Sequence, residues 1–185
     1  MVIGVLAFHG DVAEHLAVLR SLKVAAKEIR TVAALEDCTH LIIPGGESTV
    51  IAKFLHESGL DKLIRIRVSR GDLAVYGTCA GAILLAKKAT GLHAPDPLGL
   101  IDMTVDRNAY GSQMQSFDAL VHVKGLKKPL PVAFIRAPKI TNVAQSVGIL
   151  AEYGGSPVLV RQGRMLAGTF HPEVRGETAV HEIFL

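Results

Sequence analysis

The feature that most constrains the fold of this chain is a short apolar run that passes directly into a helical pattern, with a cysteine at the junction. Residues 73–76 are apolar, as expected of a buried parallel strand. Residues 80–87 are rich in alanine and leucine, which favours a helix. Cys79 lies between them, with Gly77 and Gly81 two positions away on either side. This G-x-C-x-G spacing has the form of a nucleophile elbow.

The spacing has a physical reason. A strand that turns at once into a helix holds the residue at the junction in a strained conformation, so neighbours without Cβ relieve the crowding. The side chain then projects from the end of the sheet, where the positive end of a helix dipole lowers a thiol pKa and stabilises an oxyanion. The competing interpretation is a small buried cysteine in an ordinary turn, because free cysteine is among the most buried residue types.

Composition favours one compact α/β domain over residues 1–185, with hydrophobic residues at 49% and charged residues at 20%. The net charge of +3 is modest and its basic residues are scattered, so we expect no nucleic-acid partner. No apolar run is long enough to span a bilayer, and the first residues form an apolar strand rather than a signal peptide. With two cysteines outside any disulfide pattern, we expect a cytoplasmic protein without a membrane partner.

Strands and helices alternate through about the first ninety residues. The expected elements are a strand over 2–8, a helix capped by Asp11 and ending near Leu22, strands over 24–29 and 41–43, a helix capped by Ser48 or Thr49 and ending near Gly59, and a helix over 61–69. This alternation is typical of βαβ units and predicts a parallel sheet.

The second half of the chain has a different pattern. Residues 91–99 contain two prolines and two glycines and are expected to form a loop. Short strands are expected over 103–105, 119–123 and 132–135, then a meander over 147–153, 158–161 and 165–170, and a closing helix over 177–184.

A candidate base follows the last expected strand. His171 precedes Pro172, which favours an extended backbone, so His171 and Glu173 should face the same side. A carboxylate in that position would orient the imidazole, as the third member of a catalytic triad does. The remaining histidines considered offer no spacing typical of a metal site and are expected at the surface: His15, His40, His56, His93 and His122.

A glycine-rich loop, residues 44–49, follows another expected strand. Its glycines let backbone N–H groups approach a ligand closely. Gly46 could therefore donate a hydrogen bond to a developing oxyanion, together with the N–H of Ala80. The alternative is a plain strand-to-helix turn capped by Ser48.

The elbow at residues 77–81 and the segment Phe170-His171-Pro172-Glu173 resemble the class I (triad) glutamine amidotransferases. Within that class, nearly the full length of the chain resembles the glutaminase subunits of pyridoxal phosphate synthase. The matching segments are 4–7, 10–11, 14–15, 44–49, 107–111 with Gln113, Ser116 and Phe117, 134–138, and His181 with Phe184. The resemblance implies a flavodoxin-like, three-layer α/β/α sandwich with a mainly parallel sheet, and no cofactor or metal of its own.

The resemblance also implies a reaction. Cys79 would attack the side-chain amide of L-glutamine, His171 would transfer protons and Glu173 would fix the imidazole tautomer. The glutamine site would be lined by Gly46, Glu47, Ser48, Arg107, Ile135 and Arg136. The arginine side chains offer a fork of donors that suits an α-carboxylate. The implied partner is a (β/α)8 synthase subunit that uses the ammonia to build pyridoxal phosphate.

One departure from the family concerns His9, which stands where the family usually has glutamine. In the family this loop lies close to the nucleophile, and the resemblance implies the same here. Three alternatives remain at this point: the glutaminase of another pathway, a cysteine peptidase or deglycase-like protein, and a non-catalytic interaction subunit. Peptidases and deglycases of this fold place a histidine directly after the cysteine, where this chain has Ala80.

Overall fold

The computed structural model describes residues 1–108 and 116–185. Its helices are α1 (Val12–Ser21), α2 (Val32–Leu35), α3 (Ser48–Ser58), α4 (Leu60–Ser69), α5 (Ala80–Leu85) and α6 (Ala179–Phe184), with the 3-10 helix η1 (Glu173–Arg175). Its strands are β1 (Ile3–Leu6), β2 (Ala26–Ile29), β3 (His40–Ile43), β4 (Ala74–Thr78), β5 (Ala86–Thr90), β6 (Ile101–Asp106), β7 (Phe117–Val121), β8 (Leu130–Phe134), β9 (Lys139–Val143), β10 (Gly148–Tyr153), β11 (Ser156–Gln162) and β12 (Met165–Gly168). No helix in these described ranges has the length and apolar character needed to cross a membrane.

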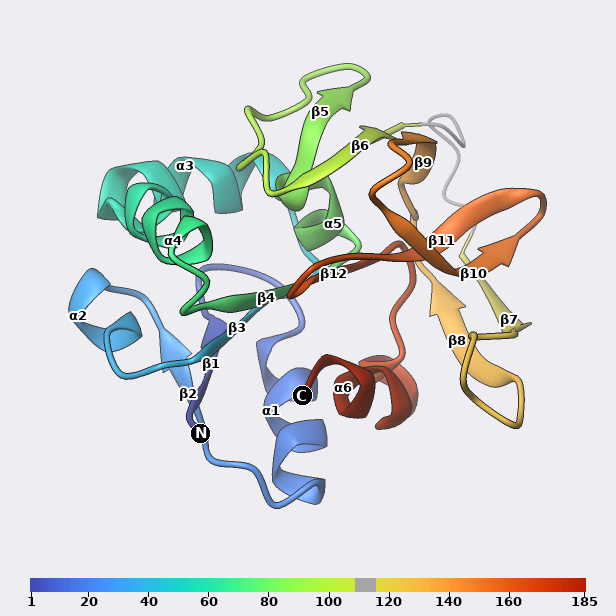
Figure 1. Cartoon of the computed structure of the whole chain (residues 1–185), viewed down its shortest axis with the longest axis horizontal. Helices are drawn as coiled ribbons and strands as arrows, with labels where there is room; N and C mark the ends of the chain where they lie inside the picture. Colours follow the sequence, from blue (N-terminus) through green and yellow to red (C-terminus); the bar gives the residue numbers. More distant parts are fainter. Residues whose placement is uncertain (109–115) are drawn as a thin grey trace.

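A seven-stranded sheet in the order β10-β11-β12-β4-β3-β1-β2 forms the centre of the molecule (Figure 1). The strands β2, β1, β3, β4 and β12 run parallel, whereas β10, β11 and β12 form the expected antiparallel meander. The order β2-β1-β3-β4 is that of a flavodoxin-like doubly wound sheet, with β12 in the fifth position. The expected mainly parallel sheet is therefore confirmed.

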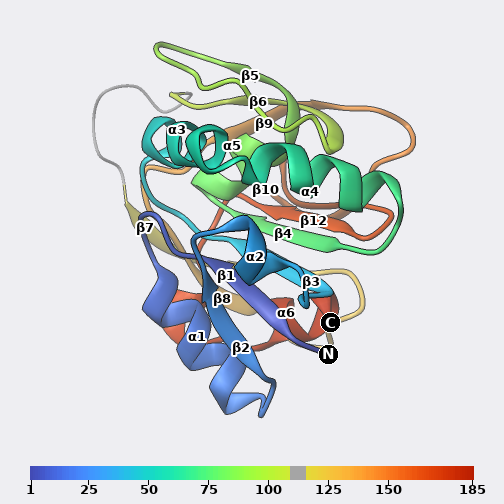
Figure 2. The same ribbon diagram turned by 90° about the vertical axis from the view of Figure 1, so that its left-hand side faces the viewer.

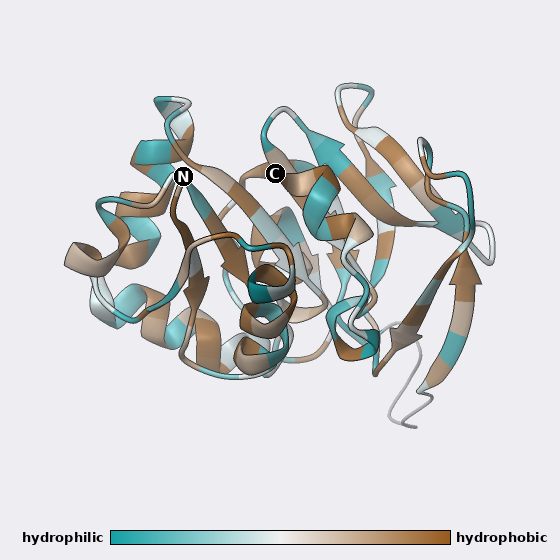
Figure 3. Cartoon of the chain, turned by 90° about the horizontal axis from the view of Figure 1, so that it is seen from below, coloured by the Kyte–Doolittle hydropathy of each residue, from teal (hydrophilic) through white to brown (hydrophobic). Residues whose placement is uncertain are grey.

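Helices cover both faces of this sheet, as Figures 1 and 2 show. On one face, α2, α3, α4 and α5 bury residues such as Leu35, Leu55 and Ile64 in one core cluster. On the other, α1 and α6 bury Leu19 and Phe184 in a second cluster. Because both faces are covered, β1 and β3 are buried along their whole length, and the strands near the N-terminus in Figure 3 are predominantly brown. These layers confirm the three-layer α/β/α architecture.

The structure corrects several element boundaries. The helix expected over 80–87 ends at Leu85, because Ala86 turns to an extended conformation and begins β5, which pairs with β6. The pairing with β6 outweighs the helix propensity of this short stretch. Strand β9 and helix α2 were not expected from the sequence. Each is short and is held by partners distant in the chain, β6 for β9 and Arg67 for α2.

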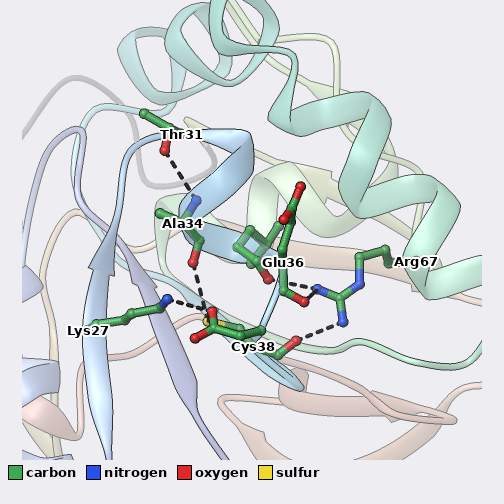
Figure 4. Close-up of polar contacts among 8 residues, drawn as sticks. Lys27, Thr31, Ala34, Glu36, Cys38 and Arg67 are labelled. Carbon is green, nitrogen blue, oxygen red and sulfur yellow. Dashed lines mark hydrogen bonds and ion pairs between the residues drawn. The ribbon is translucent and has the colours of Figure 1, made fainter.

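Contacts from α4 hold the short helix α2 (Figure 4). Thr31 Oγ1 accepts a hydrogen bond from the N–H of Ala34 and caps the start of α2. At the other end, the guanidinium of Arg67 donates to the carbonyl oxygens of Leu35 (2.8 Å) and Cys38 (2.7 Å). A charged donor on carbonyls at a helix end satisfies acceptors that have no partner within the helix. Arg67 thus holds α2 against α4, its neighbour on the same face of the sheet.

A cluster of polar side chains lies inside the second core. His15 Nδ1 is hydrogen-bonded to His181 Nε2 (2.9 Å), and His15 Nε2 to Thr78 Oγ1 (3.1 Å). All three side chains are buried. The expectation that His15 lies at the surface was therefore wrong, as it was for His40. His15 shares the buried face of α1 with Val18 and Leu19, three and four positions on, and this helical spacing was the signal in the sequence.

The buried histidine pair is held neutral. Burial, together with the nearby His181 and His171, lowers the pKa of His15 well below its usual value. Burial lowers the pKa of His181 to about 4. Two neutral imidazoles can share one N–H···N bond, in which one ring donates and the other accepts. The pair therefore depends on staying unprotonated.

We expect the stability contributed by neutral His181 to disappear in acid. The unfolded chain takes up this proton near pH 6.5, but the folded protein does so only near pH 4. The contribution is thus complete above about pH 6.5 and is lost as the pH falls toward 4, on the order of 3 kcal/mol. His181→Gln keeps hydrogen-bonding groups but does not titrate, so the wild-type advantage in urea unfolding should shrink over this range. A difference between the two proteins that does not change with pH would contradict this account.

Candidate active site

Cys79 occupies the strained junction that its flanking glycines predict. Its backbone angles are φ 48° and ψ −101°, in a region that residues with a side chain rarely adopt. A Cβ on Gly81 would lie 2.0 Å from the carbonyl oxygen of Ile43, and one on Gly77 would lie 2.5 Å from the carbonyl group of Gly81. Both glycines are therefore required for β4, β3 and α5 to meet at this point.

Cys79 opens onto a cavity of about 320 Å³ at the end of the central strands. The cavity collects residues from segments that are far apart in the sequence. Its lining consists of His9, Gly10, Asp11, Gly46, Glu47, Ser48, Cys79, Ala80, Ile83, Arg107, Asn108, Ile135, Arg136 and His171. Every site residue named from the sequence lies on this wall except Glu173, which is buried behind His171.

His171 and Glu173 form the contact that the sequence predicts, but by a different backbone path. His171 Nδ1 is 2.8 Å from Glu173 Oε1. His171 itself is extended and bridges Ala133, as expected before a proline. Pro172, however, is helical (φ −71°, ψ −32°), and Glu173 begins η1. The prediction that residues 171–173 are extended was therefore wrong. Proline restricts the conformation of the residue before it, but it leaves its own ψ angle free to be helical.

Asp11 is a further site residue, which the sequence indicated only as a helix cap. It was expected to cap α1, and it does stand at the N-cap position, but its side chain makes no capping hydrogen bond to the described backbone. Asp11 Oδ2 instead lies 3.1 Å from His171 Nδ1. The imidazole thus faces two carboxylates, one buried and one partly exposed.

These contacts set the charge of the imidazole. Burial alone lowers the pKa of His171, but its contacts with Asp11, Cys79 and Glu173 raise it to about 12. The contact with His171 lowers the pKa of Asp11, against the opposing effect of burial. Burial raises the pKa of Glu173, against its hydrogen bond to His171. The imidazolium lies between these carboxylates and Cys79, whose thiol contacts the carbonyl oxygen of Ile135 (3.8 Å), so a proton carrier and a nucleophile meet at one point.

Opposite charges lie together on the cavity wall. Arg107 Nη2 is 2.5 Å from Glu47 Oε1, which also accepts from the N–H and hydroxyl of Thr49. Glu47, rather than Ser48 or Thr49, therefore caps α3, which corrects the expected cap. Arg107 is already committed to Glu47, whereas Arg136 forms no hydrogen bond or ion pair with any described residue.

Two further positions are poised for a ligand. The Ser48 hydroxyl is buried and has no hydrogen-bond partner among the residues that the structure describes. Arg136 has φ 44°, an uncommon and costly conformation for a residue with a side chain, and such conformations cluster at functional sites. An unsatisfied hydroxyl and an available guanidinium on one wall suit a small polar ligand.

The loop that carries Gly46 contacts His9 directly. Gly46 has φ 146°, and a Cβ there would lie 2.7 Å from His9 Nδ1. The N–H of Glu47 donates to this same nitrogen (3.2 Å). Ala80 is the first residue of α5, so its N–H belongs to the donors that a helix start leaves free. His9, the residue that departs from the family, thus contacts the loop that is expected to supply an oxyanion donor.

Asp11, His171 and Glu173 each offer a possible metal-ligand atom, and these atoms lie within 4.8 Å of one another. The hydrogen bond of His171 Nδ1 to Glu173 and its ion pair with Asp11 already account for this closeness. Of the segment 107–111 with Gln113 that supported the family resemblance, Arg107 and Asn108 line the cavity, and the rest lies outside the described residues.

Comparisons with known proteins agree with this geometry. The chain is 47% identical over 184 residues to a curated protein of Thermus thermophilus, covering 100% of this chain and 96% of that one. It is 48% identical over 186 residues to one of Streptomyces avermitilis, covering 100% and 92%. Both relatives are named pyridoxal 5'-phosphate synthase subunit PdxT.

Solved structures give the same result. A crystal structure described as a glutamine amidotransferase superposes with a TM-score of 0.94 at 45% identity, covering 100% of this chain and 97% of the other. A chain of the PurLQS structure from Thermotoga maritima, at 14% identity and a TM-score of 0.72, shares the fold. The SNO glutamine amidotransferase family matches residues 5–185. This chain therefore belongs to the SNO glutamine amidotransferase family.

Proposed function

We propose that this chain hydrolyses L-glutamine to glutamate and ammonia for the synthesis of pyridoxal 5'-phosphate, with Cys79 as nucleophile, His171 as proton carrier and Glu173 as the group that orients it. The observation that carries the assignment is the placement of the strained Cys79 and the doubly paired His171 on one cavity. The glutamine amidotransferase family to which the chain belongs supplies the substrate, and the full-length relatives named as pyridoxal 5'-phosphate synthase subunits supply the pathway.

The chemistry follows from the residues in order. The thiolate of Cys79 attacks the side-chain carbonyl carbon of glutamine, and the oxyanion is held by the N–H groups of Gly46 and Ala80. The intermediate collapses to a thioester, and ammonia leaves with a proton from the His171 imidazolium. The neutral imidazole then takes a proton from water, which attacks the thioester and releases glutamate. Glu173 keeps the Nδ1 proton in place throughout.

The cavity wall supplies charges suited to an amino acid. The fork of Arg136 matches an α-carboxylate, and the Glu47 carboxylate, anchored by Arg107, attracts an α-ammonium group. The Ser48 hydroxyl and the Ile135 backbone complete the glutamine site. This distribution of charges differs from the expectation that both arginines bind the α-carboxylate. Arg107 instead contacts Glu47 and holds the carboxylate that attracts the α-ammonium group.

Ammonia is useful only if it reaches a second active site unprotonated. We therefore propose that the whole chain, residues 1–185, acts as one cytoplasmic glutaminase domain that docks on a (β/α)8 synthase subunit, without a cofactor of its own. Ala80 after the nucleophile disfavours a peptidase or deglycase, and the complete Cys79, His171 and Glu173 set disfavours a non-catalytic subunit.

Replacing the nucleophile should abolish activity and leave the fold intact. We expect Cys79→Ala to reduce ammonia release from glutamine, measured in the presence of the synthase subunit, by several orders of magnitude. The small side chain fits the buried site, so the circular dichroism spectrum and binding to the synthase should not change. Near-normal ammonia release by this variant would rule out the assignment of Cys79.

The two partners of the nucleophile should differ in importance. We expect His171→Asn to lose at least about three orders of magnitude in kcat/KM, because the group that carries the proton is then missing. Glu173→Gln should lose less than the roughly four orders of magnitude seen when a protease loses its orienting carboxylate. Equal and small losses for both variants would show that the pair is structural only.

The contact between His9 and the Gly46 loop should matter for activation by the synthase. In the isolated chain, His9 accepts the N–H of Glu47 and so holds the neighbouring peptide. We expect isolated wild type to hydrolyse glutamine poorly and the synthase to raise turnover, because one recovered oxyanion donor is worth about two to three orders of magnitude.

The test of this contact is glutamate production over a titration with the synthase subunit. His9→Ala should reduce the maximal activation more than it reduces basal hydrolysis. If isolated wild type already matches the complex, the loop is not gated. If His9→Ala is activated as fully as wild type, His9 has no part in the gate.

A further inference from the structure

The base has two acidic neighbours at one nitrogen. Glu173 Oε1 lies 2.8 Å and Asp11 Oδ2 lies 3.1 Å from His171 Nδ1. The Glu173 side chain has no solvent exposure, whereas that of Asp11 is 32% exposed. They approach from different elements, because Glu173 begins η1 and Asp11 precedes α1. The N–H of His171 Nδ1 forms its hydrogen bond with Glu173, and Asp11 lies at ion-pair distance beside that bond.

The backbone around Asp11 is built to allow this approach. A Cβ on Gly45 would lie 2.7 Å from Asp11 Oδ2 and 2.3 Å from His171 Cε1. The N–H of Asp11 also donates to the carbonyl oxygen of Gly45 (3.4 Å). Glycine at position 45 thus leaves the space in which the carboxylate and the imidazole meet, and the same contact joins Asp11 to the loop that carries Gly46.

The groups that face His171 leave Asp11 as its most persistent negative partner. The groups that face His171 are Cys79 at the end of β4, Glu173 from η1 and Asp11 itself. Behind Glu173 lies His15 of α1, 3.6 Å from the Oε1 of Glu173, and His9 lies beside Asp11. Burial raises the pKa of Glu173, whereas the contact with His171 lowers the pKa of Asp11. As the pH falls, Asp11 therefore keeps its charge longer than Glu173 does.

We propose that Asp11 is a second positioning carboxylate of this active site, which pairs electrostatically with His171 beside the Nδ1–H···Glu173 hydrogen bond and stabilises the imidazolium beside Cys79. The predicted effect of Asp11 on glutamine hydrolysis rests on the proposed function. Its predicted effect on the stability of the His171 imidazolium does not. It explains why an aspartate at a helix start leaves the backbone uncapped. It also gives the site a reserve orienting group when Glu173 is neutral or replaced.

The first test measures the thiol directly and needs no glutamine. In the isolated full chain, the rate at which iodoacetamide alkylates Cys79 is followed against pH by peptide mass spectrometry. Asp11→Asn removes the charge at nearly constant shape. Because the imidazolium is then less stable, the pH midpoint of alkylation should rise by about 1 unit. Glu36→Gln, which neutralises an exposed carboxylate after α2, serves as the matched control and should leave the midpoint unchanged.

An unchanged midpoint in Asp11→Asn would overturn the proposal, since a merely structural aspartate would not move it. Asp11→Ser provides the same charge removal with a smaller side chain if Asp11→Asn does not fold. Because alkylation does not depend on the substrate, a shifted midpoint with no glutaminase activity would refute the proposed function and leave the role of Asp11 standing.

The second test is a double-mutant cycle on glutamine hydrolysis by the complex with the synthase. If the two carboxylates substitute for each other, Asp11→Asn should reduce kcat by less than about 10-fold in wild type. In the Glu173→Gln background the same change should cost at least about 10 times more, because no carboxylate remains at Nδ1. KM should change little in both cases. Equal factors in the two backgrounds would show that Asp11 does not share the function of Glu173.

Discussion

The close approach of α5 to β3 is the constraint on which the rest of the site depends. With no side chain at Gly81, the start of α5 can pass over the carbonyl of Ile43, and Cys79 is forced into its strained conformation at the tip of β4. Strand β12 pairs in parallel with β4, so that Gly168 lies beside Thr78. The segments that leave these two strands therefore emerge together, and this pairing brings His171 to Cys79. Any change that moves α5 away from the sheet would separate nucleophile and base.

Behind this site the sheet carries polar groups into the core. His15, Thr78 and His181 are joined by hydrogen bonds, and His15 also approaches Glu173, so a buried network supports the orienting carboxylate. Burial keeps the two histidines neutral, while contacts with acidic groups keep His171 charged only a short distance away. The difference comes from the neighbours, since all three imidazoles are buried. The protein thus uses one residue type both as a neutral structural bridge and as a charged proton carrier.

Much of this arrangement could be predicted from the sequence where the signal is local. The alternation of strands and helices indicated the parallel sheet. The glycines around Cys79 indicated the elbow, because a nearby backbone atom leaves no room for a side chain at either position. Contacts between distant segments could not be predicted in this way. Asp11 was expected to cap α1 because aspartate commonly does so, and its contact with His171 depends on the distant pairing of β12 with β4. The spacing of α1 carried a local signal for the burial of His15, but its partners, Thr78 and His181, are 63 and 166 residues away and could not be predicted.

The central claim is that Cys79, activated in this cavity, forms a covalent bond with the side-chain carbon of glutamine. The most direct measurement is peptide mass mapping of the complex with its synthase after incubation with the glutamine analogue 6-diazo-5-oxo-L-norleucine. The account predicts a single adduct on the peptide that contains Cys79, slowed by excess glutamine, with the buried Cys38 unmodified in the same sample. Full glutaminase activity in a protein that carries no adduct on Cys79, or an inactivating adduct on Cys38 alone, would contradict it.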